Sequence, residues 1–310
     1  MSWSEWLARD TLVVYLFHGV VEESPWRVRN YTRKHLEARR FRSFLEDVLS
    51  AGGKPVSMEE VARLRSAGEP YPAKVFAVTF DDGFENNLSV AAPILREFGV
   101  PSTFYVSTGL VERNLMSWID RIEAVIEAVL EGKGEGSLDL PWGEGRVAFR
   151  GREETLRLLD LLRKRVKADA SLDADAFADG VARQLGREPV REGRSPLDLK
   201  LSWGQVRELA SDPLFLVGGH SHKHSILSFL PPGELEDEID LSLRLLKEKA
   251  GVGADHYSYP EGLEHCFNDR VIAALKERGV RCCPTAITGV NPAAEAGGFD
   301  LFHLRRVPVL

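Results

Sequence analysis

Two short polar runs in this sequence combine the side chains that metal-dependent hydrolysis requires. The first is Val78-Thr79-Phe80-Asp81-Asp82-Gly83, in which two adjacent carboxylates follow an apolar run. Burying two carboxylates is costly unless a cation or a proton donor compensates their charge. Because neighbouring residues of an extended chain point in different directions, one carboxylate can bind a metal ion while the other faces an attacking water. The alternative for this run alone is a polar Asp-Gly turn.

The second run is rich in histidine and follows another apolar segment: Val217-Gly218-Gly219-His220-Ser221-His222-Lys223-His224. The spacing of His220 and His224 allows a compact turn to bring both imidazoles to one cation. Gly218 and Gly219 allow the backbone to bend where the strand ends. One Asp and two His, with positions left for water, are typical of an open hydrolytic metal site rather than a closed structural one. A solvated loop or an adventitious metal site is the alternative.

Apolar strands alternating with amphipathic helices must position these runs, and this pattern predicts a largely parallel sheet or barrel. In such barrels, reactive groups collect at the carboxyl ends of the strands, where both runs lie. The predicted helices are Phe41 to Ala51, Leu88 to Phe98, Gly233 to Ala250 and Asn268 to Arg278. The predicted strands are Leu12 to Phe17, Lys74 to Phe80, Pro101 to Val106, Leu214 to Val217, Asp255 to Tyr259, Val280 to Thr285 and Leu304 to Val309.

The alternation fails between Trp118 and Ser202, where the sequence is mainly helical with a Gly-rich, hairpin-like interruption around Gly132 to Arg150. Because strands of the barrel type flank this stretch, we interpret residues 118–202 as an insertion within a single domain of residues 1–310.

Composition excludes several functional classes. The 310 residues carry a formal net charge of -7, and no stretch is dense in Lys or Arg, which argues against a nucleic-acid partner. No window approaches the roughly 20 apolar residues that span a bilayer, and the start of the chain does not resemble a signal peptide, so we predict a cytoplasmic protein. The three cysteines, two of them adjacent at Cys282 and Cys283, form no disulfide or zinc-knuckle pattern and are expected to be small buried hydrophobes.

Three blocks occur in the order of a known family's signatures: Thr79-Phe80-Asp81-Asp82-Gly83, His220-Ser221-x-x-His224 and Tyr259-Pro260-Glu261-Gly262. They resemble the polysaccharide deacetylases (carbohydrate esterase family four, the NodB-type domain). The opening Phe17-His18-Gly19-Val20 and the closing Leu304-Arg305-Arg306-Val307-Pro308-Val309 are similar to the first and last strands of one branch of that family. The resemblance spans Leu12 to Val309 apart from the insertion, and it implies a distorted (β/α) barrel with about seven parallel strands.

The resemblance also implies a role for each matched residue. Asp82, His220 and His224 would bind a divalent metal, with zinc as the first choice and cobalt, nickel, manganese or iron as alternatives. The metal would polarise the acyl oxygen and lower the pKa of its water, from which Asp81 as general base would take a proton. The backbone N–H of Tyr259 would help to hold the resulting oxyanion.

The sequence departs from the family pattern near the third block. Many relatives carry an arginine just before the tyrosine-proline pair, where it contacts the catalytic aspartate, but this chain reads His256-Tyr257-Ser258. Asp81 therefore needs another partner, and Arg306 or Arg305 on the final strand is the candidate. A surface position for both arginines is the alternative.

The acid that protonates the leaving group is less well defined. Leu301-Phe302-His303 matches a Leu-x-His run that supplies this acid in many relatives, although here it precedes the last strand. His18, at the end of the first strand, is the alternative acid or substrate contact, or a histidine with a purely structural role. His222 is expected to point away from the metal. Trp118 begins a run similar to one in the same branch, and it either stacks on a sugar or packs within a helix.

These observations predict a hydrolase that removes an acetyl or other acyl group from an N- or O-acetylated sugar or glycan intermediate. Its expected partner is that acetylated carbohydrate. One alternative is hydrolysis of a non-sugar C–N bond of the ureide or formamide type at the same metal site. Another is a catalytically silent carbohydrate-binding protein with this fold, which the intact acid and imidazole set disfavours. A phosphotransfer enzyme with an Asp nucleophile is also disfavoured. Its two acids would be separated by one intervening residue, whereas Asp81 and Asp82 are adjacent.

Overall fold

A seven-stranded sheet forms the centre of the molecule in the computed structural model, which describes residues 2–8, 10–24, 26, 28–292 and 300–310. Its main path runs β10-β1-β5-β6-β9, with β4 beside β5 and β11 beside β1. All of these pairings are parallel except that of β1 with β10. The strands are β1 Thr11–Phe17, β4 Lys54–Pro55, β5 Val75–Phe80, β6 Ser102–Val106, β9 Phe215–Gly219, β10 Asn291–Pro292 and β11 Val307–Pro308. A separate parallel pair consists of β2 Gly19–Val21 and β3 His35–Glu37.

Short backbone pairings, rather than long strands, continue the sheet from β9 round to β11. Gly219 pairs with Tyr257, and the neighbouring His256 pairs with Cys282. The Thr285 N–H then donates to the Leu304 carbonyl at 2.8 Å, and β11 lies beside β1. The predicted strands at 255–259 and 280–285 are thus present only as single bridges. The architecture confirms the predicted distorted (β/α) barrel.

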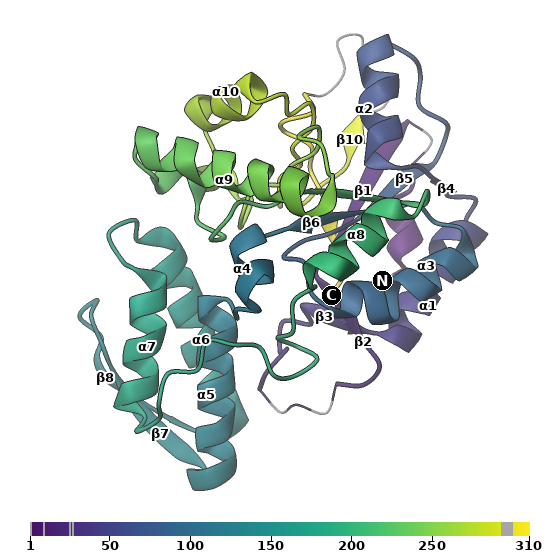
Figure 1. The fold of residues 1–310 in the computed structure, drawn as a ribbon. Helices are drawn as coiled ribbons and strands as arrows, with labels where there is room; N and C mark the ends of the chain where they lie inside the picture. The colour runs from purple at the N-terminus through teal and green to yellow at the C-terminus, as the bar shows by residue number, and fades with distance from the viewer. Residues whose placement is uncertain (1, 9, 25, 27, 293–299) are drawn as a thin grey trace.

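Helices cover the outer face of the sheet on several sides (Figure 1). They are α1 Ala38–Ser50, α2 Met58–Ala67, α3 Ala92–Phe98, α4 Thr108–Arg113, α8 Trp203–Ser211, α9 Pro232–Ala250 and α10 Asp269–Glu277. The predicted helix at 88–98 begins as a π-helical turn over Asn87–Ala91 before α3. Three-residue or four-residue 3₁₀ turns lie at Trp3–Trp6, Leu227–Phe229 and Glu264–Cys266. No helix among the described residues has the length and apolarity to cross a membrane.

Alternate residues of β5 face opposite sides of the sheet, and both sides are buried. Phe76, Val78 and Phe80 belong to the large apolar cluster that includes the buried face of α1. Thr79 lies between them and faces the other side, as the two-residue period of a strand requires. By the same period Asp81 follows Thr79 on the interior face. The two-residue side-chain period of this strand therefore sets the direction of the first candidate catalytic carboxylate.

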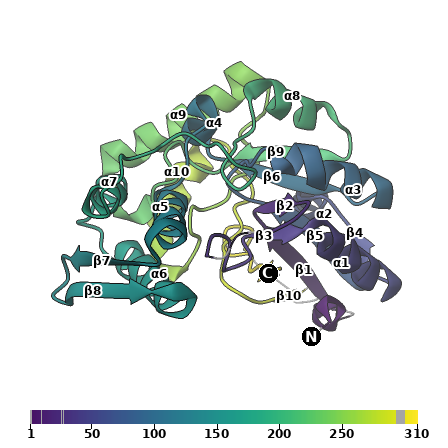
Figure 2. The same ribbon diagram turned by 90° about the horizontal axis from the view of Figure 1, so that it is seen from below.

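The stretch from Trp118 to Ser202 folds beside the barrel with an apolar cluster of its own. Figures 1 and 2 both show this group of elements on one side of the sheet, with α4 near its junction with the barrel. A β-hairpin is present within the range where the sequence predicted one. The elements are α5 Trp118–Lys133, β7 Glu135–Leu140, β8 Gly145–Arg150, α6 Gly151–Ala168 and α7 Ala174–Gln184.

Close backbone packing explains the two glycines at the end of β9. A Cβ atom on Gly218 would lie 2.6 Å from the His256 carbonyl oxygen, and one on Gly219 would lie 2.4 Å from a ring carbon of Tyr257. The segment at 256–257 can pair with β9 because Gly218 and Gly219 have no side chains that would collide with it. These glycines thus allow the barrel to continue at the strand that carries the histidine run.

We predict that Gly219→Ala destabilises the protein by about 2 kcal/mol, because the added methyl group overpacks the contact with Tyr257. Gly233→Ala in α9 is the matched control, since a Cβ atom there meets no other atom within 4 Å. The control should be neutral or slightly stabilising, because Ala is the better helix former. Urea denaturation of both variants measures the difference, and equal stabilities would contradict this account of β9.

Candidate metal centre and active site

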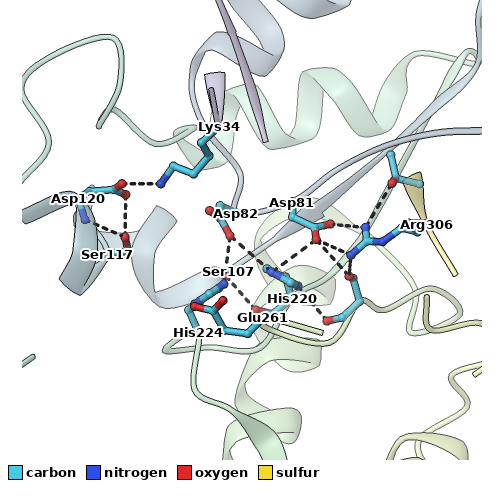
Figure 3. A network of polar contacts seen from close by, with 12 residues as sticks. Lys34, Asp81, Asp82, Ser107, Ser117, Asp120, His220, His224, Glu261 and Arg306 are labelled. Carbon is cyan, nitrogen blue, oxygen red and sulfur yellow. Dashed lines mark hydrogen bonds and ion pairs between the residues drawn. The ribbon is translucent and has the colours of Figure 1, made fainter. Parts of the chain in front are cut away.

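The two aspartates after β5 are both buried but point in different directions. Asp81 extends the strand, and its N–H donates to the Phe17 carbonyl at 3.0 Å. Asp82 has a positive φ of 74°, which turns the chain out of the strand. The turn directs its carboxylate toward the loop that follows β9 (Figure 3). The acid doublet therefore presents one carboxylate to the barrel interior and the other to the histidine run.

Asp82, His220 and His224 meet at one point. Asp82 Oδ1 lies 3.5 Å from His220 Nε2 and 3.1 Å from His224 Nε2. The three potential ligand atoms all lie within 4.8 Å of one another. Figure 3 shows both imidazoles directed at the same carboxylate. The structure thus brings Asp82 to two histidines that lie more than a hundred positions later in the chain.

Hydrogen bonds to the protein hold the His220 ring in position. Its Nδ1 lies 2.9 Å from the Ser258 carbonyl oxygen, so Nδ1 carries the proton and Nε2 presents a lone pair to the cluster. The His220 N–H donates to the Val106 carbonyl at 3.0 Å, and Ser107 Oγ donates to the His220 carbonyl at 2.8 Å. Contacts from β6 and from Ser258, which immediately precedes the third signature block, therefore orient this candidate ligand before any cation binds.

The three side chains fit a divalent cation. Asp82 Oδ1 is buried and accepts no hydrogen bond from the described residues, although a buried carboxylate oxygen normally has a partner. Burial opposes its charge, but His224 and His220 hold the pKa of Asp82 well below its usual range. Asp82 in turn raises the pKa of His224 against the effect of burial. An ionised carboxylate facing two imidazoles is the donor set of an open zinc-type site.

Arg306 compensates the charge of Asp81. Its guanidinium donates to both carboxylate oxygens, at 2.9 Å to Oδ1 and 2.7 Å to Oδ2, and it is completely buried. Arg306 also donates to Thr79 Oγ1 at 3.2 Å, to Ser258 Oγ at 3.0 Å and to the Thr285 carbonyl at 2.5 Å. Burial alone would raise the pKa of Asp81, but Arg306 and His220 lower it, so Asp81 is ionised at neutral pH. Figure 3 shows Arg306 on the side of Asp81 away from Asp82.

A cavity of about 230 Å³ opens over these groups and is lined by Asp81, Asp82, His220 and His224. His18 also lines it, and burial lowers the pKa of this imidazole to about 4 although Asp82 and Asp81 act in the opposite direction. His18 is therefore neutral at neutral pH and can exchange hydrogen bonds with a ligand. The cavity leaves room for water and for a small acyl group beside the acid pair.

The remaining predicted residues occupy varied positions. The Tyr259 side chain is buried, with its hydroxyl 3.2 Å from the Phe302 carbonyl, while its backbone N–H has no hydrogen-bond acceptor in the described part of the chain. His303 is exposed, lies 3.0 Å from Asp300 and does not line the cavity, so the structure does not bring it to the acid pair. His222 Nδ1 lies 3.0 Å from Thr108 Oγ1, which keeps its ring apart from the cluster. Arg305 is exposed, in contrast to Arg306.

Sequence reasoning did not find several polar groups of the cavity wall. Lys34 lines the cavity and forms an ion pair with buried Asp120, to which Ser117 Oγ donates at 2.7 Å (Figure 3). Lys167 and Glu261 also line the cavity and form an ion pair with each other. Glu261 lies in the third signature block, but no sequence pattern marks Lys34 or Lys167. Both are lysines whose importance arises only from their place in the fold.

Backbone strain is concentrated at this site. Of the eight non-glycine residues with positive φ in the described chain, four are Asp82, Ser221, His224 and Glu261, with values between 59° and 74°. This conformation is unfavourable for residues with a Cβ atom and persists where the surroundings enforce it. The strained residues are those that turn the candidate ligands and the cavity wall toward one another.

The fold and the site define the class as an α/β barrel with a potential metal centre at the carboxyl ends of its strands. A family model of the polysaccharide deacetylases matches residues 68–283. The chain therefore belongs to the polysaccharide deacetylase family, whose NodB-type members are generally metal-dependent. It is a hydrolase that acts on amide or ester bonds of acetylated sugars.

Solved structures share the fold at low sequence identity. The deacetylase PplD of Streptococcus pyogenes, in complex with acetate, is 18% identical with a TM-score of 0.60, covering 97% of this chain and 92% of its own. IcaB from Ammonifex degensii is 20% identical with a TM-score of 0.59, covering 98% and 94%. The BpsB deacetylase domain from Bordetella bronchiseptica is 16% identical with a TM-score of 0.58, covering 98% and 97%. A search of curated proteins finds no match to this chain.

We predict that Arg306→Met destabilises the protein by about 3–5 kcal/mol, because it leaves the Asp81 carboxylate buried without its cation. Arg305→Met is the matched control, since the neighbouring side chain is exposed, and its effect should stay within about 0.5 kcal/mol. Denaturant unfolding at neutral pH gives both values. Similar losses for the two variants would mean that the pairing with Asp81 contributes little.

We also predict that Asp120→Asn costs about 3 kcal/mol at neutral pH, because Lys34 loses its partner. Glu97→Gln, which removes an exposed ion pair with Arg42, should cost less than about 1 kcal/mol. Burial alone would raise the pKa of Asp120, but Lys34 and Lys200 lower it, so the stabilisation is complete above pH ~4 and is lost as the pH falls further. The unfolding free energies of wild type and Asp120→Asn should therefore become equal as the pH is lowered. A constant difference in acid would refute the pairing.

Proposed function

We propose that this enzyme removes an acetyl group from an N- or O-acetylated sugar or glycan intermediate, with Asp82, His220 and His224 holding one divalent cation. The observation that carries the proposal is the buried Asp82 oxygen, which faces two imidazole Nε2 atoms and lacks a hydrogen bond within the described structure. Zn²⁺ suits this donor set best, and Co²⁺, Ni²⁺, Mn²⁺ or Fe²⁺ are alternatives. When bound, the cation polarises the acyl carbonyl and lowers the pKa of a water molecule.

Asp81 acts as the general base in this proposal. It is ionised, lies at the cavity, and has its Oδ2 atom 4.0 Å from His220 Nε2, beside the point where the candidate ligands meet. From there its carboxylate can take the proton of the attacking water. The two hydrogen bonds from Arg306 fix its orientation and keep it charged until that step.

Two further groups complete the proposed reaction. The backbone N–H of Tyr259 has no acceptor among the described residues and would donate to the oxyanion that develops on the acyl oxygen. His18 lines the cavity as a neutral imidazole and would bind the leaving group, while protonated Asp81 returns its proton to the amine or alcohol. His303 has no part in the proposal, because its exposed ring lies outside the cavity wall.

Metal analysis together with acetate release tests the proposal. We expect about one divalent cation per chain and acetate release from at least one compound in a panel of N- and O-acetylated, nucleotide-linked and lipid-linked sugars. Asp81→Asn should keep the cation and lose at least about a hundredfold in kcat, because it cannot accept the proton. Asp82→Ala should lose the cation itself.

Thermal unfolding of Asp81→Asn serves as the control for folding, since this variant also weakens the pairing with Arg306. Turnover by Asp81→Asn near the wild-type rate would exclude Asp81 as the base. A metal-loaded protein that releases acetate from none of these sugars would overturn the proposed activity. Activity confined to long polymers would count against a glycan intermediate as the substrate.

A further inference from the structure

A second, larger cavity of about 910 Å³ adjoins the one over the acid pair. Five residues line both cavities: Ser117, Trp118, Lys167, His224 and Glu261. The larger cavity is lined by residues of α5 to α7, by the loop before α9 and by Gly109, Leu110 and Arg113 of α4. Its volume is in the range of sites that enclose a whole small ligand. A substrate whose acetyl group sits at His224 therefore has room to extend along the insertion.

Most acidic side chains of the larger cavity already have partners within the protein. Arg121 forms ion pairs with Asp175 and Asp179, and Arg191 also binds Asp179. Glu261 is paired with Lys167. Asp169 accepts hydrogen bonds from Ser171 and Trp142, and Asp173 caps α7. Three acids of this wall, Asp175, Asp179 and Glu261, are thus paired with cations, whereas Asp169 and Asp173 accept hydrogen bonds from neutral donors and keep their charge.

The cations of the same wall are not all matched. Arg113, Arg183 and Lys223 line the cavity and form no ion pair or side-chain hydrogen bond with any described residue, and Asp169, Asp173 and Glu234 are the acids of the wall without a cationic partner there. Six cations and six acids line the cavity in all, so its wall is balanced in charge, and these three cations stand out only because they have no ion-pair partner among the described residues.

Arg113 and Lys223 lie next to the candidate metal centre. Lys223 immediately precedes His224 in the chain. The α4 helix packs on the same turn, because the Gly109 N–H donates to the His222 carbonyl at 2.8 Å. Arg113 is four residues after Gly109 and so lies on the same face of α4. Lys223 thus lies in the turn that carries the candidate ligand, Arg113 lies on the helix that packs against this turn, and both line the larger cavity.

We propose that Arg113 and Lys223 bind an anionic group, a phosphate or a carboxylate, that the acetylated sugar substrate carries. Resting on the proposed deacetylase activity, this inference narrows its substrate class to anionic glycans or sugar phosphates. The planar guanidinium of Arg113 matches the oxygens of either group in a bidentate manner, and Lys223 adds a point charge. The insertion supplies the opposite wall, so the larger cavity holds the part of the substrate beyond the acetylated ring.

Relative rates on matched substrates test the inference. We expect wild-type enzyme to prefer an N-acetylated oligosaccharide that bears a terminal phosphate or a uronate over the same neutral oligosaccharide. In Arg113→Gln/Lys223→Gln, the ratio of kcat/KM for the anionic substrate to that for the neutral one should fall on the order of tenfold. The preference should also weaken with added salt. Comparing the oligosaccharide that bears a phosphate with the one that bears a uronate shows which of the two anionic groups the enzyme prefers.

Arg42→Gln/Lys164→Gln is the matched control, because it removes the same two charges from exposed positions outside both cavities. This control should keep the wild-type ratio. An unchanged ratio in Arg113→Gln/Lys223→Gln, or the same fall in the control, would overturn the proposal.

Direct binding separates this inference from the proposed activity. Calorimetric titration with N-acetylglucosamine 1-phosphate should give a Kd about tenfold lower for wild type than for Arg113→Gln/Lys223→Gln. Any phosphate contact to the metal is common to both proteins and so does not produce this difference. Equal Kd values would refute the anion site even if the enzyme releases acetate. A protein that shows the binding difference but releases no acetate from any sugar would refute the deacetylase activity instead.

Discussion

The burial of two adjacent carboxylates is the constraint on which the rest of this site depends. Asp81 and Asp82 are both almost inaccessible to solvent, and two buried negative charges side by side would be strongly destabilising without compensation. The protein compensates them separately. Arg306 from the end of the chain forms two hydrogen bonds with Asp81, and the imidazoles after β9 face Asp82. This division gives the two acids different chemical environments although they are neighbours in the chain.

That division also explains the departure from the family pattern before the tyrosine-proline block. Here Ser258 occupies the site in place of a cation, and its hydroxyl accepts a hydrogen bond from Arg306 while lying 3.4 Å from Asp81. The cation itself comes from the last strand, which reaches the acid because β11 lies beside β1 and β1 lies beside β5. A guanidinium delivered from a different element thus fulfils the same electrostatic requirement, since the charge at Asp81 matters rather than its position in the sequence.

The insertion contributes to the site as well as packing beside it. Its first helix carries Asp120, which holds Lys34 at the cavity, and α6 carries Lys167, which pairs with Glu261 of the third signature block. The barrel and the insertion therefore share ion pairs at the cavity wall. These contacts place the larger cavity against the candidate metal centre, and this arrangement is the basis for assigning an extended substrate to the enzyme.

The sequence by itself determined the residues that meet and the type of fold around them. The two-residue side-chain period of β5 and the histidine spacing after β9 are local features, and they set the directions in which Asp81 and the ligand candidates point. Only the tertiary structure decided between Arg306 and Arg305, excluded His303 from the cavity, and brought Lys34 and Lys167 to its wall. The tertiary structure also reduced the predicted strands at 255–259 and 280–285 to single bridges. These outcomes depend on which distant segments lie together, and no single segment of the chain encodes that information.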